Sequence, residues 1–357
     1  MRKIKEINFV SSFKISNDYL FLDSQKSLYL FYNDNLVYSI AIEEGYQLRD
    51  VKDNFCIFSD TNEPNIIIYK ALQVFLELRN NSFLFYYNRK GIFYDKMIRK
   101  TVIFDFDMKV IEREISERLG NKIFFSVKFL IANTLFDNTK LTSYSFSKNT
   151  PLWHYSLPEG VYLQGTDYAP ALSKGIEKIL GVYDSILWIV NDVGHLIGLD
   201  IASGICKFHL KKPKNLSKKW EGWEVFVHAT KSFIDTNNGV IFGLDNVHYW
   251  ECDLNDPTET YLHFDISAIN QKNDIIPDFL GNWKGDEIFF GQNSFAKDPS
   301  YVGIFNRQTK QITWTSRKLG EEGTFKGINK VEYQDNRLYV LDRTSTLHIF
   351  ERESTNV

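Results

Sequence analysis

The stretch from Ile186 to Leu210 constrains the fold of this chain more than any other part of the sequence. It contains three short apolar runs, 186–190, 195–199 and 205–210, separated by segments rich in Asn, Asp and Gly. Apolar, β-branched and aromatic runs of this length predict β-strands, and Asn, Asp and Gly between them predict tight turns. A meander of three strands cannot bury both of its faces alone, so the chain should contain neighbouring copies of the unit.

Copies of this unit recur with a nearly constant period in the second half of the chain. An aromatic residue closes each of four successive units, every 53–55 residues; these residues are Trp153, Phe208, Tyr261 and Trp314. Eight positions before each aromatic stands a residue whose side chain can cap a turn; these are Ser145, Asp200, Asp253 and Asn306. A period of about 40–55 residues with four strands per unit is the signature of propeller blades.

The first half of the chain holds shorter units with the same pattern of strands and turns. Three groups of four predicted strands precede residue 116, although residues 111–120 also fit a short helix that ends at a glycine, and residues 122–157 form a fourth group. The total is eight blades, with seven left open because the crowded first hundred residues could hold one blade fewer. The last unit, 328–352, has only three strands, whereas residues 1–10 form a strand without a neighbour. We therefore expect an all-β fold, a single β-propeller domain over residues 1–357, whose ring is closed by residues 1–10 pairing with the last blade.

The unit from Gly198 to Phe208, GLDIASGICKF, resembles the repeat of pyrroloquinoline-quinone-type (PQQ-like) propellers, small-x-Asp-x-x-x-Gly-x-x-x-Trp. Three further units match it with another residue at the glycine position; these residues are Asn149, Pro257 and Lys310. The resemblance implies that the closing aromatics are structural and dock one blade on the next. It extends to architecture alone, because no residue matches the cofactor or calcium ligands of the quinone dehydrogenases.

Composition and charge indicate the compartment and exclude several partners. The formal net charge of −3 gives no reason to expect nucleic acid or an anionic membrane as a partner. The first ten residues lack the apolar core of a signal peptide, and no apolar run approaches the ~18 residues of a membrane span. Three cysteines without paired spacing, Cys56, Cys206 and Cys252, predict buried free thiols. We expect a cytoplasmic monomer.

A glutamate, a glycine and an aromatic residue recur at four junctions between predicted blades. The aromatic residues at these junctions are Tyr46, Tyr162, Trp223 and Phe325. In a propeller such junctions lie on one face, around the mouth of the central channel, where exposed aromatics on a rigid scaffold suit partner binding. The alternative is a shared glycine turn whose aromatic packs under the neighbouring blade.

Residues 201–220 contain six lysines and no acidic residue, and they lead into Trp220. Lysines beside aromatics can hold nucleic acid or an acidic protein. No second basic tract extends this surface, so an acidic protein is the better prediction; a solvated connecting loop is the alternative. Lys218, Lys219 and Trp220 therefore join the predicted partner-binding rim.

No motif in the sequence indicates catalysis. The nucleophile-elbow, phosphate-loop and dinucleotide-binding patterns are missing, and the seven histidines show no metal-binding spacing. We predict a non-catalytic propeller without cofactor or metal that binds another protein, as an interaction scaffold or as an immunity-like protein that neutralises its partner. The alternative is a carbohydrate-binding or carbohydrate-active propeller that uses the channel-mouth aromatics, with two carboxylates across the channel if it cleaves glycans.

Overall fold

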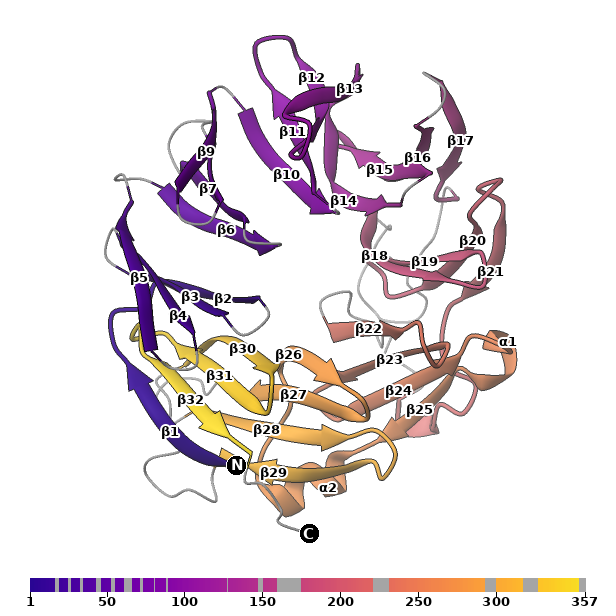
Figure 1. Cartoon of the computed structure of the whole chain (residues 1–357). Helices are drawn as coiled ribbons and strands as arrows, with labels where there is room; N and C mark the ends of the chain where they lie inside the picture. The colour runs from indigo at the N-terminus through magenta and orange to yellow at the C-terminus, as the bar shows by residue number, and fades with distance from the viewer. Residues whose placement is uncertain are drawn as a thin grey trace. The chain divides into compact units, whose positions relative to one another are not determined.

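The computed structural model describes the chain with short gaps. The described residues are 1–16, 19–24, 27–32, 35–42, 46–52, 55–60, 66–70, 73–79, 81–87, 89–126, 128–146, 150–158, 175–220, 231–292, 300–316 and 327–352. Every strand within these residues belongs to one of eight four-stranded antiparallel sheets (Figure 1). The fold is all-β, a β-propeller of eight four-stranded blades, as predicted, and the seven-blade alternative is wrong.

The chain divides into two compact units, one formed by Met1–Ser116 with Lys272–Val357 and the other by Glu117–Gln271. With blades numbered in chain order, the first unit contains blades 1, 2, 3, 7 and 8, and the second contains blades 4, 5 and 6. That residues 1–357 form a single domain stays a prediction.

Five blades make up the first unit. Blade 1 consists of β2 Ser12–Ser16, β3 Tyr19–Ser24, β4 Ser27–Tyr32 and β5 Asn35–Ala41. Blade 2 consists of β6 Tyr46–Lys52, β7 Phe55–Asp60, β8 Ile66–Lys70 and β9 Gln73–Leu78. Blade 3 consists of β10 Asn81–Tyr87, β11 Lys90–Asp95, β12 Lys100–Asp105 and β13 Val110–Ile115. Blade 7 consists of β26 Phe279–Lys284, β27 Glu287–Gln292, β28 Tyr301–Asn306 and β29 Gln311–Thr315. Blade 8 consists of β30 Ile328–Gln334, β31 Arg337–Asp342, β32 Leu347–Glu351 and β1 Arg2–Ile7.

Three blades make up the second unit. Blade 4 consists of β14 Leu119–Phe125, β15 Phe129–Thr134, β16 Asp137–Ser145 and β17 Pro151–Ser156. Blade 5 consists of β18 Ile176–Tyr183, β19 Ile186–Asn191, β20 Leu196–Asp200 and β21 Cys206–Leu210. Blade 6 consists of β22 Ser232–Asp235, β23 Val240–Asp245, β24 His248–Asp253 and β25 Leu262–Asp265. The helical elements are η1 Lys218–Trp220, α1 Pro257–Thr260 and α2 Ser267–Asn273.

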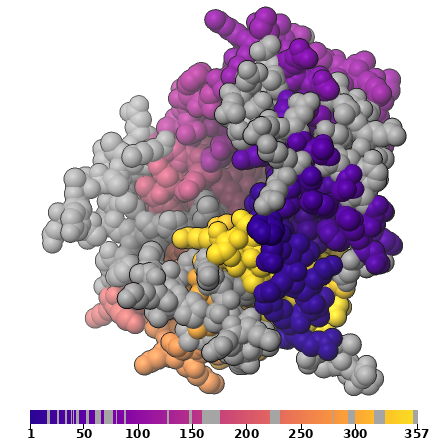
Figure 2. Space-filling model, turned by 90° about the vertical axis from the view of Figure 1, so that its left-hand side faces the viewer, coloured from indigo at the N-terminus to yellow at the C-terminus, as the bar shows by residue number. Residues whose placement is uncertain are grey.

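The first strand of the chain completes the last blade, as predicted. β1 pairs antiparallel with β32, from Arg2 opposite Glu351 to Ile7 opposite Leu347. The two strands lie side by side in Figure 1, and in Figure 2 the indigo surface of the first residues lies against the yellow surface of the last blade. This pairing covers the edge that β32 would otherwise expose.

Apolar side chains fill the space between neighbouring blades of the same unit. In the second unit one cluster joins blades 4 and 5 and another joins blades 5 and 6. In the first unit separate clusters join blade 8 to blade 1, blade 1 to blade 2, blade 2 to blade 3, and blade 7 to blade 8. Apolar side chains on the blade faces thus build a core between neighbouring blades of each unit.

Trp153 docks blade 4 on blade 5, as the repeat implies. Its ring is buried, and its indole N–H donates to the Ile201 carbonyl at 2.9 Å. A Cβ at Gly204 would lie 2.6 Å from the same ring, so the ring needs a glycine beneath it. Gly204 also has a φ of +72°, in the left-handed region that favours glycine. At the equivalent position of blade 7, Lys310 takes the same conformation, with a φ of +56°.

A β-bulge recurs in the outer strands. In six blades the outer strand has one residue without an opposite partner on the neighbouring strand. These residues are Val37, Phe75, Glu112, Leu152, Lys207 and Thr313. In β1 the extra residue is Ile4. In blade 4 the residue after the bulge is the docking Trp153. The bulge therefore sets which face of the outer strand carries the blade-docking side chain.

Three sequence-based expectations fail locally. The sequence between Pro158 and Ser185 predicts a long connector that could hold a short helix, but residues 176–183 form the strand β18. Residues 110–115 form β13 as predicted, so the helix alternative there is wrong. Cys206 is exposed, whereas Cys56 and Cys252 are buried as expected. Tyr261 precedes β25 instead of lying within an outer strand, because α1 replaces the turn.

Within the described ranges, no helix is long and apolar enough to cross a membrane.

Candidate functional site

The connection that leaves blade 5 runs along the outer edge of blade 6. We call its residues 211–220 the basic strap. The backbone N–H of Lys214 donates to the Tyr261 carbonyl at 2.9 Å. The Asn215 side chain then pairs with the backbone of His263, donating to its carbonyl at 2.7 Å and accepting from its N–H at 2.6 Å. The strap thus satisfies backbone groups on the edge of β25 and covers part of that edge.

Trp220 anchors the far end of the strap in η1. Its side chain is 8% exposed, and its ring packs edge-on against His248 with the ring centroids 4.5 Å apart. The indole N–H donates to Oδ2 of Asp265 at 3.0 Å. Because most of the ring is covered within blade 6, it offers little surface on which a base or a sugar could stack.

Asp265 gathers several donors at the same point. Its Oδ2 accepts from Trp220 and from Lys219 Nζ at 3.2 Å, and its Oδ1 accepts from the Ser267 backbone N–H at 2.9 Å. Burial alone would raise the pKa of Asp265, but the hydrogen bonds from Ser267, Trp220 and Lys219 hold it well below its usual range. Asp265 is therefore ionised over the whole physiological pH range and offsets the charge of Lys219.

The lysines of the strap divide into paired and unpaired groups. Lys214 forms an ion pair with Glu259, and Lys219 forms one with Asp265. Lys211, Lys212 and Lys218 are exposed and form no ion pair with any acidic group in the described part of the chain. The three unpaired charges lie on a segment that hydrogen bonds hold in place. The result is a preorganised cationic surface.

Two histidine pairs lie in blades 5 and 6. His195 Nδ1 lies 2.9 Å from His209 Nε2, and His248 Nδ1 lies 2.9 Å from His263 Nε2. Burial, with repulsion from the neighbouring histidine, lowers the pKa of both His195 and His263 to about 4. All four rings are therefore neutral at pH 7, since burial also lowers the pKa of His209 and His248. Among the residues with described positions, no three His, Cys, Asp or Glu side chains gather as a metal site would require.

The structure brings together part of the predicted rim. Lys218 and Lys219 lie exposed at the end of the strap beside the buried Trp220. Tyr46 begins β6 in the first unit, is partly buried, and packs against the cluster between blades 1 and 2. Tyr162, Trp223 and Phe325 lie outside the described residues, as do the junction glycines. The rim as a whole therefore stays a prediction.

Sequence reasoning missed the residues that fix the strap. Asn215 and Asp265 hold it in place, yet each contacts partners 45 or more positions away in the chain. Neither residue belongs to a sequence pattern that predicts such a contact. The unpaired Lys211 and Lys212 stand out in the sequence as part of the lysine run, but their lack of an acidic neighbour depends on the fold.

No protein-family model matches the chain, and no curated protein sequence matches it. Several solved structures share its fold. The BamB structure from Moraxella catarrhalis is 12% identical, with a TM-score of 0.62 over 98% of this chain and 99% of that one. Sqt1 from Saccharomyces cerevisiae is 8% identical, with a TM-score of 0.63 over 99% of both chains. The C-terminal WD40 domain of Sif2 is 10% identical, with a TM-score of 0.60 over 99% of this chain and 98% of that domain. At these identities the likeness establishes the β-propeller fold and leaves the function to be argued from the chain itself.

Proposed function

We propose that this chain is a non-catalytic propeller that binds another protein, with the basic strap as a contact surface and an acidic segment as the partner. The observation that carries the proposal is the set of three unpaired lysines on a strap already fixed to blade 6. A segment that is ordered before binding loses less conformational freedom on association. Unpaired surface charge also speeds encounter with an oppositely charged partner.

Three features support a protein partner over nucleic acid. The chain is slightly negative overall, the basic strap is a short segment, and its one tryptophan is buried. Single-stranded nucleic acid is held by exposed aromatics along an extended basic groove. An acidic protein segment can be bound by the charges of exposed lysines alone, without exposed aromatic rings.

The finer proposals follow from the sequence. The protein would act as a monomer in the cytoplasm, as a scaffold or as an immunity-like protein that neutralises its partner. We also propose that the blades are PQQ-like repeats, supported by the Gly204 turn beneath Trp153. The carbohydrate-binding alternative depends on Tyr162, Trp223 and Phe325, which lie outside the described residues, and no described contact favours it.

The test reverses the three unpaired charges in one variant, Lys211→Glu, Lys212→Glu and Lys218→Glu. Wild type and variant serve as baits in native lysate, and the captured protein is purified for calorimetry against both. We expect the variant to bind it at least about tenfold more weakly, with a steep dependence on salt for the wild type, because the attraction is between charges.

The matched control makes the same change of charge at exposed lysines outside the strap, Lys96→Glu, Lys128→Glu and Lys272→Glu. It should bind like the wild type. Equal weakening in both variants would contradict the strap as the contact. A wild-type bait that captures no protein, or that prefers a single-stranded oligonucleotide to the acidic partner, would contradict the function proposed.

A further inference from the structure

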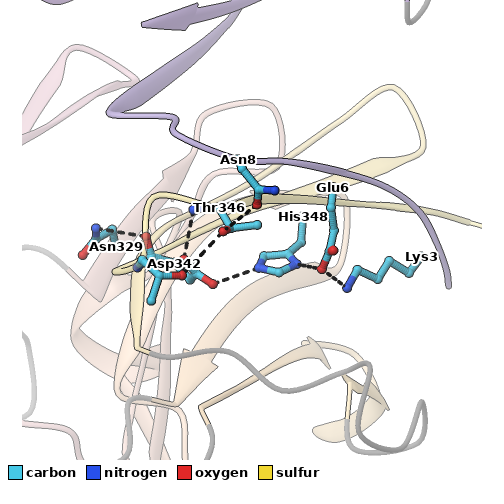
Figure 3. Close-up of polar contacts among 8 residues, drawn as sticks. Lys3, Glu6, Asn8, Asn329, Asp342, Thr346 and His348 are labelled. Atoms are coloured by element: carbon cyan, nitrogen blue, oxygen red, sulfur yellow. Dashed lines mark hydrogen bonds and ion pairs between the residues drawn. The ribbon is translucent and has the colours of Figure 1, made fainter. Parts of the chain in front are cut away.

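A buried histidine joins the first strand of the chain to the last blade. His348 lies in β32 and is 5% exposed. Its Nε2 is 2.9 Å from Oδ2 of Asp342, at the end of β31, and its Nδ1 is 2.9 Å from Oε1 of Glu6 in β1. Figure 3 shows the ring between the two carboxylates, which come from opposite sides. The contact with Glu6 is at ion-pair distance and does not have the geometry of a hydrogen bond, so it is an attraction between charges when the ring is protonated.

The position of this ring calls for two protons. A neutral imidazole carries a proton on one nitrogen and a lone pair on the other, whereas the imidazolium carries a proton on both. With a carboxylate oxygen 2.9 Å from each nitrogen, the neutral ring would turn a lone pair toward one of the two negative charges. The charged ring is attracted to both carboxylates, and a buried charge is tolerated when it is paired in this way.

Both carboxylates are held in their ionised form. Burial would raise the pKa of Asp342, but hydrogen bonds from His348, Thr344 and Thr346 lower it below its usual value. The hydrogen bond from Lys3 lowers the pKa of Glu6. Lys3 also contacts Glu6 directly within β1, as Figure 3 shows. Neither partner of His348 therefore takes up the proton near neutral pH.

The other charged groups on the neighbouring elements are engaged elsewhere. Lys5 of β1 lies over the Phe31 ring at 5.1 Å. Arg337 of β31 pairs with Glu351 at the far end of the β31–β32 pair. From blade 7, the Trp314 ring contacts Phe350 and carries no charge. Among the contacts described, Asp342 and Glu6 are the charges placed against the ring.

We propose that His348 is a proton-dependent latch that fastens strand β1 to blade 8. With its proton, the ring links β1 to β31 through Glu6 and Asp342. Loss of the proton breaks the Glu6 arm. The remaining links near this end of β1 include its backbone pairing, the packing of Ile4 and Ile7, the hydrogen bond from the Val10 N–H to the Ser345 carbonyl at 2.8 Å and the Thr346–Asn8 hydrogen bond at 3.1 Å. Opening of β1 then uncovers the edge of β32, which can accept another strand.

The pH dependence has a definite sign. The latch is complete while the ring carries both protons and weakens as the pH rises and one proton is lost. It also weakens in strong acid, where Glu6 and Asp342 take up protons at their lowered pKa values. β1 is therefore held most firmly in mildly acidic solution.

The test measures amide hydrogen exchange of the full chain at pH 6 and pH 8.5, corrected for the intrinsic exchange rates. Protection of the β1 amides that pair with β32 should fall by about tenfold at the higher pH, since one charge-assisted contact is lost. Protection in β11 and β12 of blade 3, a blade without histidine, should not fall. An unchanged protection of β1, or an equal loss in all blades, would overturn the latch.

Two variants separate the latch from folding. Glu6→Gln removes the carboxylate at a half-exposed position, and its amide can pair with either form of the ring, so β1 protection should become independent of pH. His348→Gln should show low β1 protection already at pH 6. His154→Gln is the control, because His154 is exposed on β17, and it should keep the wild-type dependence. A wild-type dependence retained in Glu6→Gln would assign the effect to another group.

A direct readout of the ring needs no variant. Nitrogen-15 spectra of His348 at pH 6 should show both ring nitrogens carrying protons. A single protonated nitrogen at that pH would contradict the two-proton ring on which the latch depends.

Discussion

At the scale of single residues, this protein depends on a few side chains that reach into the next blade. Trp153 packs on the backbone of the following blade, where Gly204 leaves room for its ring. Lys178 of β18 similarly donates to the Ser232 carbonyl of the next inner strand at 2.9 Å. Burial lowers the pKa of this lysine, and its position over the Phe233 ring partly replaces the lost water. Such contacts turn independent four-stranded sheets into a continuous core within each unit.

The replacement Trp153→Ala should destabilise the protein by about 3–5 kcal/mol, because it removes a buried ring and leaves a cavity between blades 4 and 5. Denaturant unfolding of the full chain measures this change. Leu152→Ala changes the neighbouring bulge residue, which is 47% exposed, and should stay within about 0.5 kcal/mol of the wild type. Equal effects of the two replacements would contradict the docking role of Trp153.

At the scale of elements, the outer strand of each blade forms the sheet edge that another chain could pair with. Most outer strands carry a bulge, which weakens regular pairing with another chain. β25 has no bulge in its pairing with β24, and the basic strap covers its edge instead. The strap therefore has a structural role, because it covers the edge of β25 whether or not a partner binds. The charge of its lysines on this edge also discourages aggregation.

Loss of the Asn215 side chain should loosen the strap without unfolding blade 6. Asn215→Ala removes two hydrogen bonds to His263 and should cost about 1–2 kcal/mol, with faster hydrogen exchange at the His263 amide. Ser217→Ala is the control within the strap, because its described contact is made by the backbone carbonyl. If His263 exchanges no faster in Asn215→Ala, the strap is held by other contacts.

At the scale of the whole molecule, histidines give different parts of the chain opposite responses to pH. His195 and His263 are buried and neutral, with a pKa of about 4 against about 6.5 in an unfolded chain. Between these values the unfolded chain binds more protons, so stability falls as the pH falls through this range. The proposed latch at His348 has the opposite sign, because the charged ring makes its contacts. Acid thus weakens blades 5 and 6, whereas alkali weakens the attachment of β1.

Urea unfolding should therefore occur at a lower midpoint at pH 5 than at pH 7. The double variant His195→Gln, His209→Gln removes one neutral pair and should show a smaller difference between the two pH values, whatever its absolute stability. A pH difference as large as that of the wild type would show that this histidine pair does not set the acid response.

The sequence by itself determined the strands, the turns and their repetition, since these depend on near neighbours in the chain. Alternating apolar residues, a capping side chain eight positions before each closing aromatic, and the unpaired first strand were sufficient to predict eight blades and their closure. The sequence did not predict the strand β18, because Gly181 interrupts an apolar run whose spacing also fits a helix.

Only the tertiary structure decided which polar residues contact one another. His348 is joined to Glu6 across almost the whole chain, and Asn215 to His263 over 48 positions. Trp220 is buried, whereas Lys211, Lys212 and Lys218 form no ion pair within the described ranges. Burial and charge pairing depend on where residues lie in space. A sequence predicts them only where its apolar and polar residues repeat with a regular period.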